Sequence, residues 1–236
     1  MAIIHKTTMN PGKMELLAAW LPQRPWYLAT GRPPAPVKAG GFRLDDPQGE
    51  VGVEIMVVTD TSGERPHSYH LPVTYRAAPL EGAEAGLIGT SEHGVLGRRW
   101  VYDGTHDPVC VALLLALIQG RAAAQHQNLS EVPEPSVTAR YTGPEVPELP
   151  VAGQPEVADG AEGTEVVLPG GALLGVTRVL LPLDADAEKE ADGEAPAGAA
   201  ADAVVAAWTT PDGAAHRGVF ASLSFGPPVR AADVSR

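Results

Sequence analysis

The sequence is poor in the residues on which several classes of protein depend. Its 236 residues include a single cysteine, Cys110, which excludes an internal disulfide and a cysteine-based zinc site. The 17 lysines and arginines stand against 29 aspartates and glutamates, a net charge of −12, so no basic face is expected for a phosphate backbone. Only 5 % of the residues are aromatic, and Ala, Gly and Pro are abundant, a bias typical of high-GC bacterial coding sequences. We therefore expect no nucleic-acid partner.

Long hydrophobic runs are also missing. The longest, Val109 to Ile118, is about half of the roughly 20 residues that a membrane-spanning helix needs. The first residues, MAIIHKTTMN, lack the basic flank and apolar stretch of a signal peptide. The sequence therefore predicts a cytoplasmic protein without a membrane partner, and its 44 % of apolar residues are enough for a folded core.

Sequence motifs of catalysis or phosphate binding are absent. There is no Gly-rich loop ending in Gly-Lys-Ser/Thr, no GxGxxG, no kinase catalytic loop and no GxSxG. His67 and His70 have an HxxH spacing, but residues three apart on a strand point to opposite faces, so they do not suit one metal ion. Cys110 has no basic neighbour to lower its pKa, and spacing offers no support for pairing His70 with Glu54. We expect no catalytic residue, cofactor or metal, hence no enzyme.

The apolar pattern predicts a helix followed by an antiparallel meander. Asn10-Pro11 suggests an N-cap and a first helical residue, and the helix of about three turns is expected to stop at Pro22. Valines and an isoleucine alternate with polar residues from Glu50, which is typical of a half-buried strand. Pro72 suggests that its strand lies at an edge or has a bulge. The predicted strands are residues 37–44, 50–59, 67–76 and 95–102.

A second helix and further strands are expected beyond the meander. Asp107-Pro108 again suggests a cap and a first helical residue, and the following run is apolar nearly all round, as in a helix between two layers. Residues 121–128 are a candidate polar extension of this helix. The turn Pro211-Asp212-Gly213 predicts a hairpin. The predicted C-terminal strands are residues 164–168, 172–183, 204–210 and 214–225.

The predicted fold class is therefore α+β: a curved antiparallel meander packed on an N-terminal helix, then a second helix and additional C-terminal antiparallel strands. Residues 142–163 contain four prolines and no periodicity, which indicates a linker. Residues 184–202 are acidic and lack large side chains, which indicates a mobile loop. The remaining parts are residues 1–141 and 164–236, and we expect the C-terminal strands to extend the first sheet, because about 60 ordered residues alone would be marginally stable.

Six aromatic and basic residues form the candidate interaction surface. Aromatic rings beside a guanidinium suit sugar rings or a protein partner. The simpler interpretation, which we favour for the tryptophans, is that they pack against the sheet as core. Two neighbouring arginines point to opposite faces of their strand, so at most one shares a surface with the next tryptophan. The six residues are Trp26, Tyr27, Tyr75, Arg98, Arg99 and Trp100.

Several of these segments together resemble a known module. The stretch LLAAWLPQRPWY, then GFRLDDPQGEVGVEIMVVTD, YHLPVTYR and LIGTSEHGVLGRRWVYDGTHDPV, occur in the order of the N-terminal cap of maltokinases. The resemblance covers roughly residues 1–125. It implies a cystatin-like topology, a curved antiparallel sheet around a helix. In the full kinases such a cap lies beside the nucleotide-binding lobe and is thought to influence its closure, whereas catalysis belongs to the kinase lobes.

The rest of the chain departs from that family. About 110 residues follow the cap-like region, and their pattern predicts a linker and strands where a kinase has its catalytic lobes. We therefore expect a non-catalytic accessory protein, an interaction or regulatory module linked to a sugar kinase or another carbohydrate enzyme, or a homo-oligomer. The alternative is a binding protein for a sugar or an apolar molecule on the concave face of the sheet, with Trp26, Tyr75 and Trp100 as its aromatics.

Overall fold

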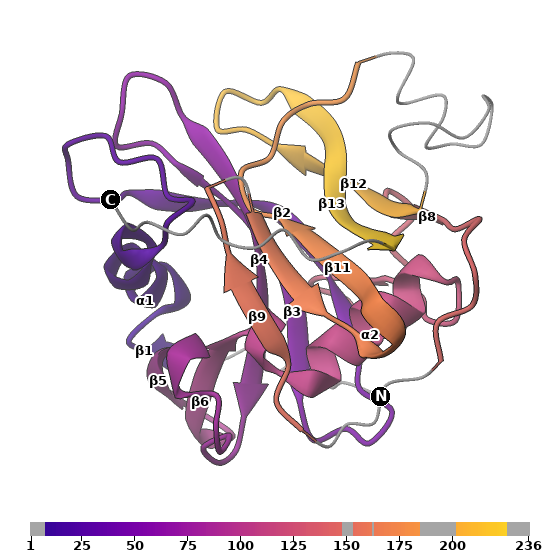
Figure 1. Ribbon diagram of the computed structural model, residues 1–236. Coiled ribbons are helices and arrows are strands. Elements are labelled where there is room, and N and C mark those ends of the chain that lie inside the picture. Colours follow the sequence, from indigo (N-terminus) through magenta and orange to yellow (C-terminus); the bar gives the residue numbers. More distant parts are fainter. Residues whose placement is uncertain (1–7, 148–152, 162, 185–201, 226–236) are drawn as a thin grey trace, which may run out of the picture.

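The structure is a computed structural model that describes residues 8–147, 153–161, 163–184 and 202–225 (Figure 1). Most of the predicted acidic loop, residues 185–201, lies outside these residues. The described part contains α1 (Lys13–Trp20), α2 (Pro108–Ile118) and four single turns of 3-10 helix, Leu21–Gln23, Glu84–Gly86, Gly104–His106 and Pro169–Gly171. Its strands are β1 (Met9–Asn10), β2 (Pro36–Asp45), β3 (Gly52–Asp60), β4 (His67–Arg76), β5 (Leu87–His93), β6 (Gly97–Asp103), β7 (Gln125–His126), β8 (Thr138–Arg140), β9 (Glu156–Asp159), β10 (Gly163–Val167), β11 (Ala172–Thr177), β12 (Ala203–Thr209) and β13 (Ala215–Phe225).

These strands form one antiparallel sheet, which confirms the α+β prediction. Their order is β1-β5-β6-β4-β3-β2-β12-β13-β11-β10-β9, with β7 beside β2 and β8 beside β12. The C-terminal strands join the first strands where β12 pairs with β2, at Trp208 opposite Gly40. At this point β2 has a bulge, and Gly41 has a φ of +125°, so the strand bends where the two halves join. The division of the chain into separate folding units stays a prediction.

The central strands β3 and β4 carry a different core on each face. Ile55 and Val57 share the side of α2, as the alternation of the sequence predicted. Met56 and Val58 point to α1, so the face that was expected to be polar is buried as well. The α1 side is a compact cluster with aromatic residues. The α2 side is larger and includes side chains from β11, β12 and β13. In Figure 1, α2 accordingly lies between the first strands and the orange and yellow strands.

Helix α2 begins where the sequence predicted. The Asp107 carboxylate accepts a hydrogen bond of 3.0 Å from the Val109 N–H, and Pro108 occupies the first helical position. Nine of its eleven residues are buried, because strands of both halves of the sheet pack around it. Gly120 follows with a φ of +70° and ends the helix. Residues 121–128 do not extend it: they turn away and form β7.

Several boundaries differ from the predictions. Helix α1 is capped by Gly12 instead of Asn10, which lies in β1, and it spans eight residues, about two turns, before the 3-10 turn at Leu21–Gln23. Five strands, β1, β5, β7, β8 and β9, were not predicted, and β9 lies inside the predicted linker. Four of these are only two to four residues long, and β5 has a glycine-associated bulge, so their alternation is too short or too irregular to detect.

The prediction for Pro72 was wrong, because β4 is an interior strand. One side of β4 pairs with β3 along its length. On the other side, the first half of β4 meets the chain after β11, where the His70 N–H donates to the Arg178 carbonyl at 3.0 Å, and the second half pairs with β6 from Val73 onward. Pro72 lies where the neighbour of β4 changes from the chain after β11 to β6. Its missing N–H therefore removes no hydrogen bond between β4 and β6. The sheet thus curls until its second half touches its first.

In the part of the chain that the structure describes, no helix has the length and apolar character that crossing a membrane would require.

Candidate functional site

Trp26 and Tyr27 are placed in the core on the α1 side. Trp26 has no exposed surface, and its ring lies 5.6 Å from Trp20 and 6.0 Å from Tyr69, measured between ring centroids. Tyr27 is half-buried and donates a hydrogen bond of 2.8 Å to Asp60. Its pKa is raised to about 12 by burial and by that carboxylate. Trp26 therefore packs as core and offers no surface to a partner.

The other four candidates do not share one surface either. Tyr75 faces α1, where its hydroxyl donates to Glu54 at 2.7 Å, whereas Trp100 lies on the opposite side of the sheet. Arg98 shares a face of β6 with Trp100 and pairs with Glu92 across the strands, at 2.7 Å. Arg99 points to the other face and donates to the Leu96 carbonyl. The sheet thus separates the aromatics proposed for a concave ligand site.

The pair of His70 and Glu54, considered in the sequence, is separated as well. Glu54 lies on the α1 side of β3, and His70 on the α2 side of β4, so the two cannot act together. Burial raises the pKa of the Cys110 thiol well above its usual value, in keeping with an inert side chain. Among the described residues, no group of three or more His, Cys, Asp or Glu side chains is arranged to hold a metal ion.

A buried ion pair joins the first part of the chain to its C-terminal strands. Arg178, which follows β11, has no exposed surface and donates to the Asp103 carboxylate at the end of β6, at 2.5 Å. It also donates to Thr164 of β10 at 2.7 Å and to Thr105 at 3.2 Å. Its guanidinium lies 5.1 Å from the centre of the Trp26 ring, within reach of a cation–π interaction. Arg178 therefore contacts both halves of the sheet where they meet.

The charge of Arg178 lowers the pKa values of Asp103 and His70. Burial alone would raise the pKa of Asp103, but the charge and hydrogen bond of Arg178 hold it below its usual value. His70 is fully buried, and burial together with the charge of Arg178 lowers its pKa to about 3. Its Nδ1 lies 2.9 Å from the Thr177 carbonyl. His70 is thus neutral at pH 7, and these groups stabilise the join between the two halves.

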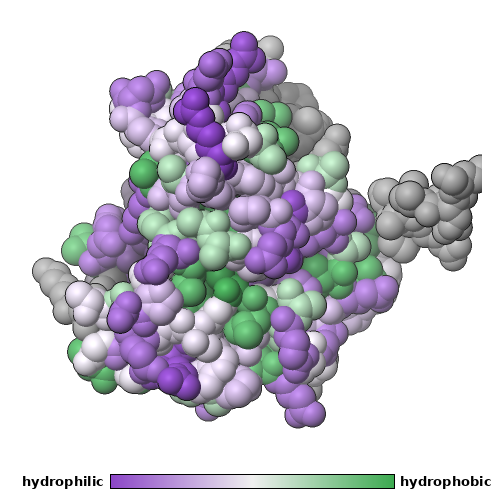
Figure 2. Space-filling model, turned by 90° about the vertical axis from the view of Figure 1, so that its left-hand side faces the viewer, coloured by the Kyte–Doolittle hydropathy of each residue, from purple (hydrophilic) through white to green (hydrophobic). Residues whose placement is uncertain are grey.

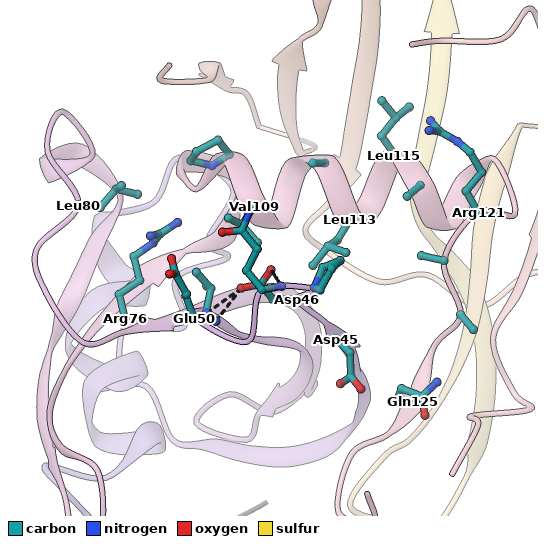
Figure 3. Close-up of a pocket in the computed structure, with 18 residues that line it drawn as sticks. Asp45, Asp46, Glu50, Arg76, Leu80, Val109, Leu113, Leu115, Arg121 and Gln125 are labelled. Atoms are coloured by element: carbon teal, nitrogen blue, oxygen red, sulfur yellow. Dashed lines mark hydrogen bonds between the residues drawn. The ribbon is translucent and has the colours of Figure 1, made fainter. Parts of the chain in front are cut away.

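A groove with a volume of about 580 Å³ lies beside α2. Figure 3 shows α2 along one side and the β2–β3 turn along the other, with Val109 and Leu113 pointing from the helix toward the turn. Ala112 and Ala116 contribute small, half-buried side chains. Sequence reasoning missed this groove, because its two sides are far apart in the chain.

One end of the groove is surrounded by carboxylates. Asp46 accepts hydrogen bonds from the backbone N–H groups of Gln48, Glu50 and Val51, at 2.9–3.0 Å, and so shapes the turn (Figure 3). Arg76 is held by the buried Asp107 through two bonds of 2.7 Å.

The same end has an excess of negative charge. The Glu50 side chain is exposed, and within the described residues its carboxylate makes no hydrogen bond or ion pair. Asp46 and Glu50 therefore line the groove on the side of Arg76, whose guanidinium is paired with the buried Asp107.

A second surface feature lies on the side of α1 and β5. On the face shown in Figure 2, apolar side chains gather among polar ones. Leu16 and Ile88 are half-buried and pack against the α1 cluster. The apolar residues continue the α1 cluster to the surface, and no hollow of useful size accompanies them: the cavity beneath Leu16 and Ile88 holds about 10 Å³.

Comparison with known families found a match to part of the chain. The family model of the maltokinase N-terminal cap domain matches residues 20–107, from the last residue of α1 to the N-cap of α2. The match confirms the resemblance, over a shorter range than the roughly 125 residues expected. It contains β2 to β6, Trp26 and Asp103, whereas Arg178 and all of α2 lie outside it. A comparison with curated proteins found no match.

Proposed function

We propose that this chain is a non-catalytic accessory protein that contacts a sugar kinase or another enzyme of carbohydrate metabolism and regulates it. The observation that carries the proposal is the cap-domain match over residues 20–107. In this chain the matched region is completed by strands of the same sheet, β9 to β13, where a kinase would continue with its lobes. A cap presented on such a scaffold is suited to binding.

The roles of the buried polar residues support the non-catalytic part of the proposal. Asp107 caps α2 and binds Arg76, and Asp103 binds Arg178. Glu54 accepts from Lys13 and Tyr75. A catalytic acid or base needs a free position facing a reactant. Each of these carboxylates is already bound to neighbouring side chains that hold the fold together.

A second candidate function is the binding of a small molecule. It is favoured by the volume of the α2 groove, about 580 Å³, which falls in the range of ligand pockets, roughly 300–1,000 Å³. A sugar is a weaker match than an apolar molecule, because the groove is lined by alanine, leucine and valine and none of its lining residues is aromatic.

The proposal is tested by mixing the purified full chain with the sugar kinases of the same cell and recording native mass spectra and kinase rates. We expect a complex of defined stoichiometry and a changed kcat or KM of the kinase, with no turnover of ATP and maltose by the chain alone. Turnover by the chain itself, lost on substitution of one polar residue, would refute the non-catalytic assignment. If the chain binds none of these enzymes and only an apolar ligand raises its thermal stability, the second candidate replaces the first.

A further inference from the structure

The positive charges of this acidic chain are distributed unevenly. Several described cations are paired with carboxylates: Lys13, Arg43, Arg76, Arg98 and Arg178. Four others form no ion pair with a described carboxylate and belong to two segments that lie side by side: Arg24, Arg32, Lys38 and Arg65. The chain has 29 acidic and 17 basic residues, so a group of unpaired cations stands out against its overall charge.

A loop and a turn carry these four cations, and we call the two segments together the basic surface. The loop comprises residues 23–38, which lead from α1 into β2 and contain no acidic residue. The turn comprises residues 61–66, between β3 and β4. The Thr30 and Ser62 hydroxyl oxygens lie 2.7 Å apart, and Arg32 donates to the Ser62 carbonyl at 3.5 Å. Figure 1 accordingly shows the indigo loop beside the violet turn, at one end of β3 and β4.

Three of the cations extend into solvent. Arg32, Lys38 and Arg65 are exposed, whereas Arg24 is half-buried. The Arg24 guanidinium lies 4.9 Å from the centre of an aromatic ring at the end of α1. Glu64 is the one exposed acid of the two segments. The exposed part of the basic surface therefore carries three positive charges and one negative charge.

The nearby carboxylates lie beneath this surface or are already paired. Asp60 is only 1 % exposed and is enclosed by hydrogen-bond donors. Asp159 contacts the loop through the indole of the buried Trp26. Glu54, on the α1 side of β3, is paired with Lys13. None of these three carboxylates forms an ion pair with a cation of the basic surface, so the exposed charge is available to a partner.

The exposure of the cations favours a broad occupant. A small anion on Arg32 or Arg65 would stay in contact with water, where a single ion pair contributes little. An anionic membrane is opposed by the net charge of −12 and by the presence of only three exposed cations, since basic segments that bind such lipids typically have about 4–8 lysines and arginines. Leu28 and Val37 of the same loop are 41 % and 39 % exposed and add apolar contact. Cations with apolar residues between them suit an acidic protein surface.

We propose that the basic surface is the contact site for an acidic segment of a protein partner. Its carboxylates pair with Arg32, Lys38 and Arg65, and its apolar side chains pack on Leu28 and Val37. This inference rests on the proposed function as an interaction module. All five residues lie inside the part of the chain that matches the cap domain. Opposite charges across such a contact accelerate association and make the affinity depend on salt.

The first test uses a fluorescently labelled synthetic peptide of about ten residues, which spans about 33 Å when extended. It contains glutamates and two leucines, and a control peptide has lysine in place of each glutamate. Binding to the full chain is measured by anisotropy at about 50 and about 200 mM salt. We expect the acidic peptide to bind and to lose at least about threefold in affinity at the higher salt, and the lysine peptide not to bind. Equal binding of the two peptides, or no binding of the acidic one, would overturn the proposal.

A comparison of single variants locates the contact. Arg65→Gln should weaken peptide binding about threefold, because it removes an unpaired charge of the basic surface. The matched control is Arg98→Gln, which removes the same charge from an exposed arginine that is paired with Glu92 on β5, and it should change the affinity by less than about 1.5-fold. Combined replacement of Arg32, Lys38 and Arg65 by glutamine should cost at least about tenfold. Equal effects of the two single variants would show that only net charge matters, which contradicts the proposal.

Three outcomes separate this inference from the proposed function. If a sugar kinase binds the chain and the triple variant binds it equally well, the function stands and the assignment of the basic surface fails. If no kinase binds, but the triple variant loses the acidic peptide while its thermal unfolding is unchanged, the basic surface stands and the function fails. Binding of the parent chain to phosphatidylserine vesicles, or its self-association in sedimentation, would identify a membrane or a second copy as the occupant if the triple variant abolished it, and would overturn the inference.

Discussion

Replacement of Arg178 by methionine should destabilise the whole protein, because it removes the cation from a buried ion pair. Arg178 has no exposed surface, and its partner Asp103 is only 2 % exposed. The change removes a bond of 2.5 Å to Asp103 and one of 2.7 Å to Thr164, and it leaves the Asp103 carboxylate buried with hydrogen bonds from Thr105 alone. Breaking one partner of a buried pair costs about 3–5 kcal/mol.

The free energy of unfolding is measured by urea denaturation, followed by tryptophan fluorescence and by far-UV circular dichroism. A loss of about 3–5 kcal/mol is a large fraction of the roughly 5–15 kcal/mol by which a protein of this kind is stable. The midpoint should therefore move to clearly lower urea, with an unchanged slope if both states keep their compactness. Trp26, whose ring lies 5.1 Å from the Arg178 guanidinium, reports on the site of the change.

The companion variant Asp103→Asn separates the charge from the shape. Asparagine can still accept the hydrogen bonds from the Thr105 N–H and hydroxyl through its Oδ1, so it mainly removes the charge facing Arg178. The double variant should be less destabilised than the sum of the single ones, by about 1–3 kcal/mol, because neither charge is then left unpaired. Additive effects, or a loss below about 1 kcal/mol in Arg178→Met, would refute the reasoning.

The same experiment tests whether the cap-like region and the C-terminal strands fold as one unit. Arg178 binds Asp103 of the first part and Thr164 of the second, so the two parts should unfold together. Coincident fluorescence and circular dichroism transitions are expected in the parent protein. Two separate transitions would instead favour two domains.

Two further predictions concern single residues. The free energy of unfolding should fall by about 3 kcal/mol from pH 6.5 to about pH 4. The pKa of His70 is lowered from 6.5 to about 3 in the folded protein. The contribution of His70 to stability is therefore fully present above pH 6.5, and it is lost as the pH falls and the unfolded chain takes up the proton. Urea titrations at several pH values should show this slope reduced in His70→Gln, and an equal slope would contradict the assignment. Gly41→Ala should cost more than about 2 kcal/mol, because Gly41 has a φ of +125° and an added Cβ would lie 2.1 Å from the Ile55 carbonyl oxygen. Gly12→Ala, with nothing within 4 Å of its added Cβ, should cost less than about 1 kcal/mol in thermal unfolding, and equal losses would contradict the steric argument.

The elements with strong local signals could be predicted from the sequence alone. Asp107-Pro108 marked the start of α2, because an N-cap carboxylate and a first-turn proline act within a few residues. The alternation of Val53, Ile55 and Val57 correctly placed these residues on one side of β3, although the other side is also buried. The hairpin around Asp212 followed from its turn residues. In each case the physical cause lies in neighbouring residues, so the pattern is visible without the fold.

The candidate site could not be predicted in the same way. Trp26 was considered for a surface, but its burial depends on Tyr69 and on Arg178, about 150 residues further along the chain. The groove depends on the distance between α2 and the β2–β3 turn, which no local pattern encodes. Pro72 suggested an edge strand, and only the change of pairing partner along β4 explains how an interior strand accommodates it.

The sequence by itself determined the class of fold, the existence of both helices with the start of α2, and the resemblance to the maltokinase cap. Only the tertiary structure decided how the C-terminal strands join that region, which polar residues are buried, and where the surface is hollow. The physical reason is that helix caps, alternation and turns act over a few residues. The Asp103–Arg178 pair and the α2 groove, by contrast, arise from contacts between segments that the sheet brings together.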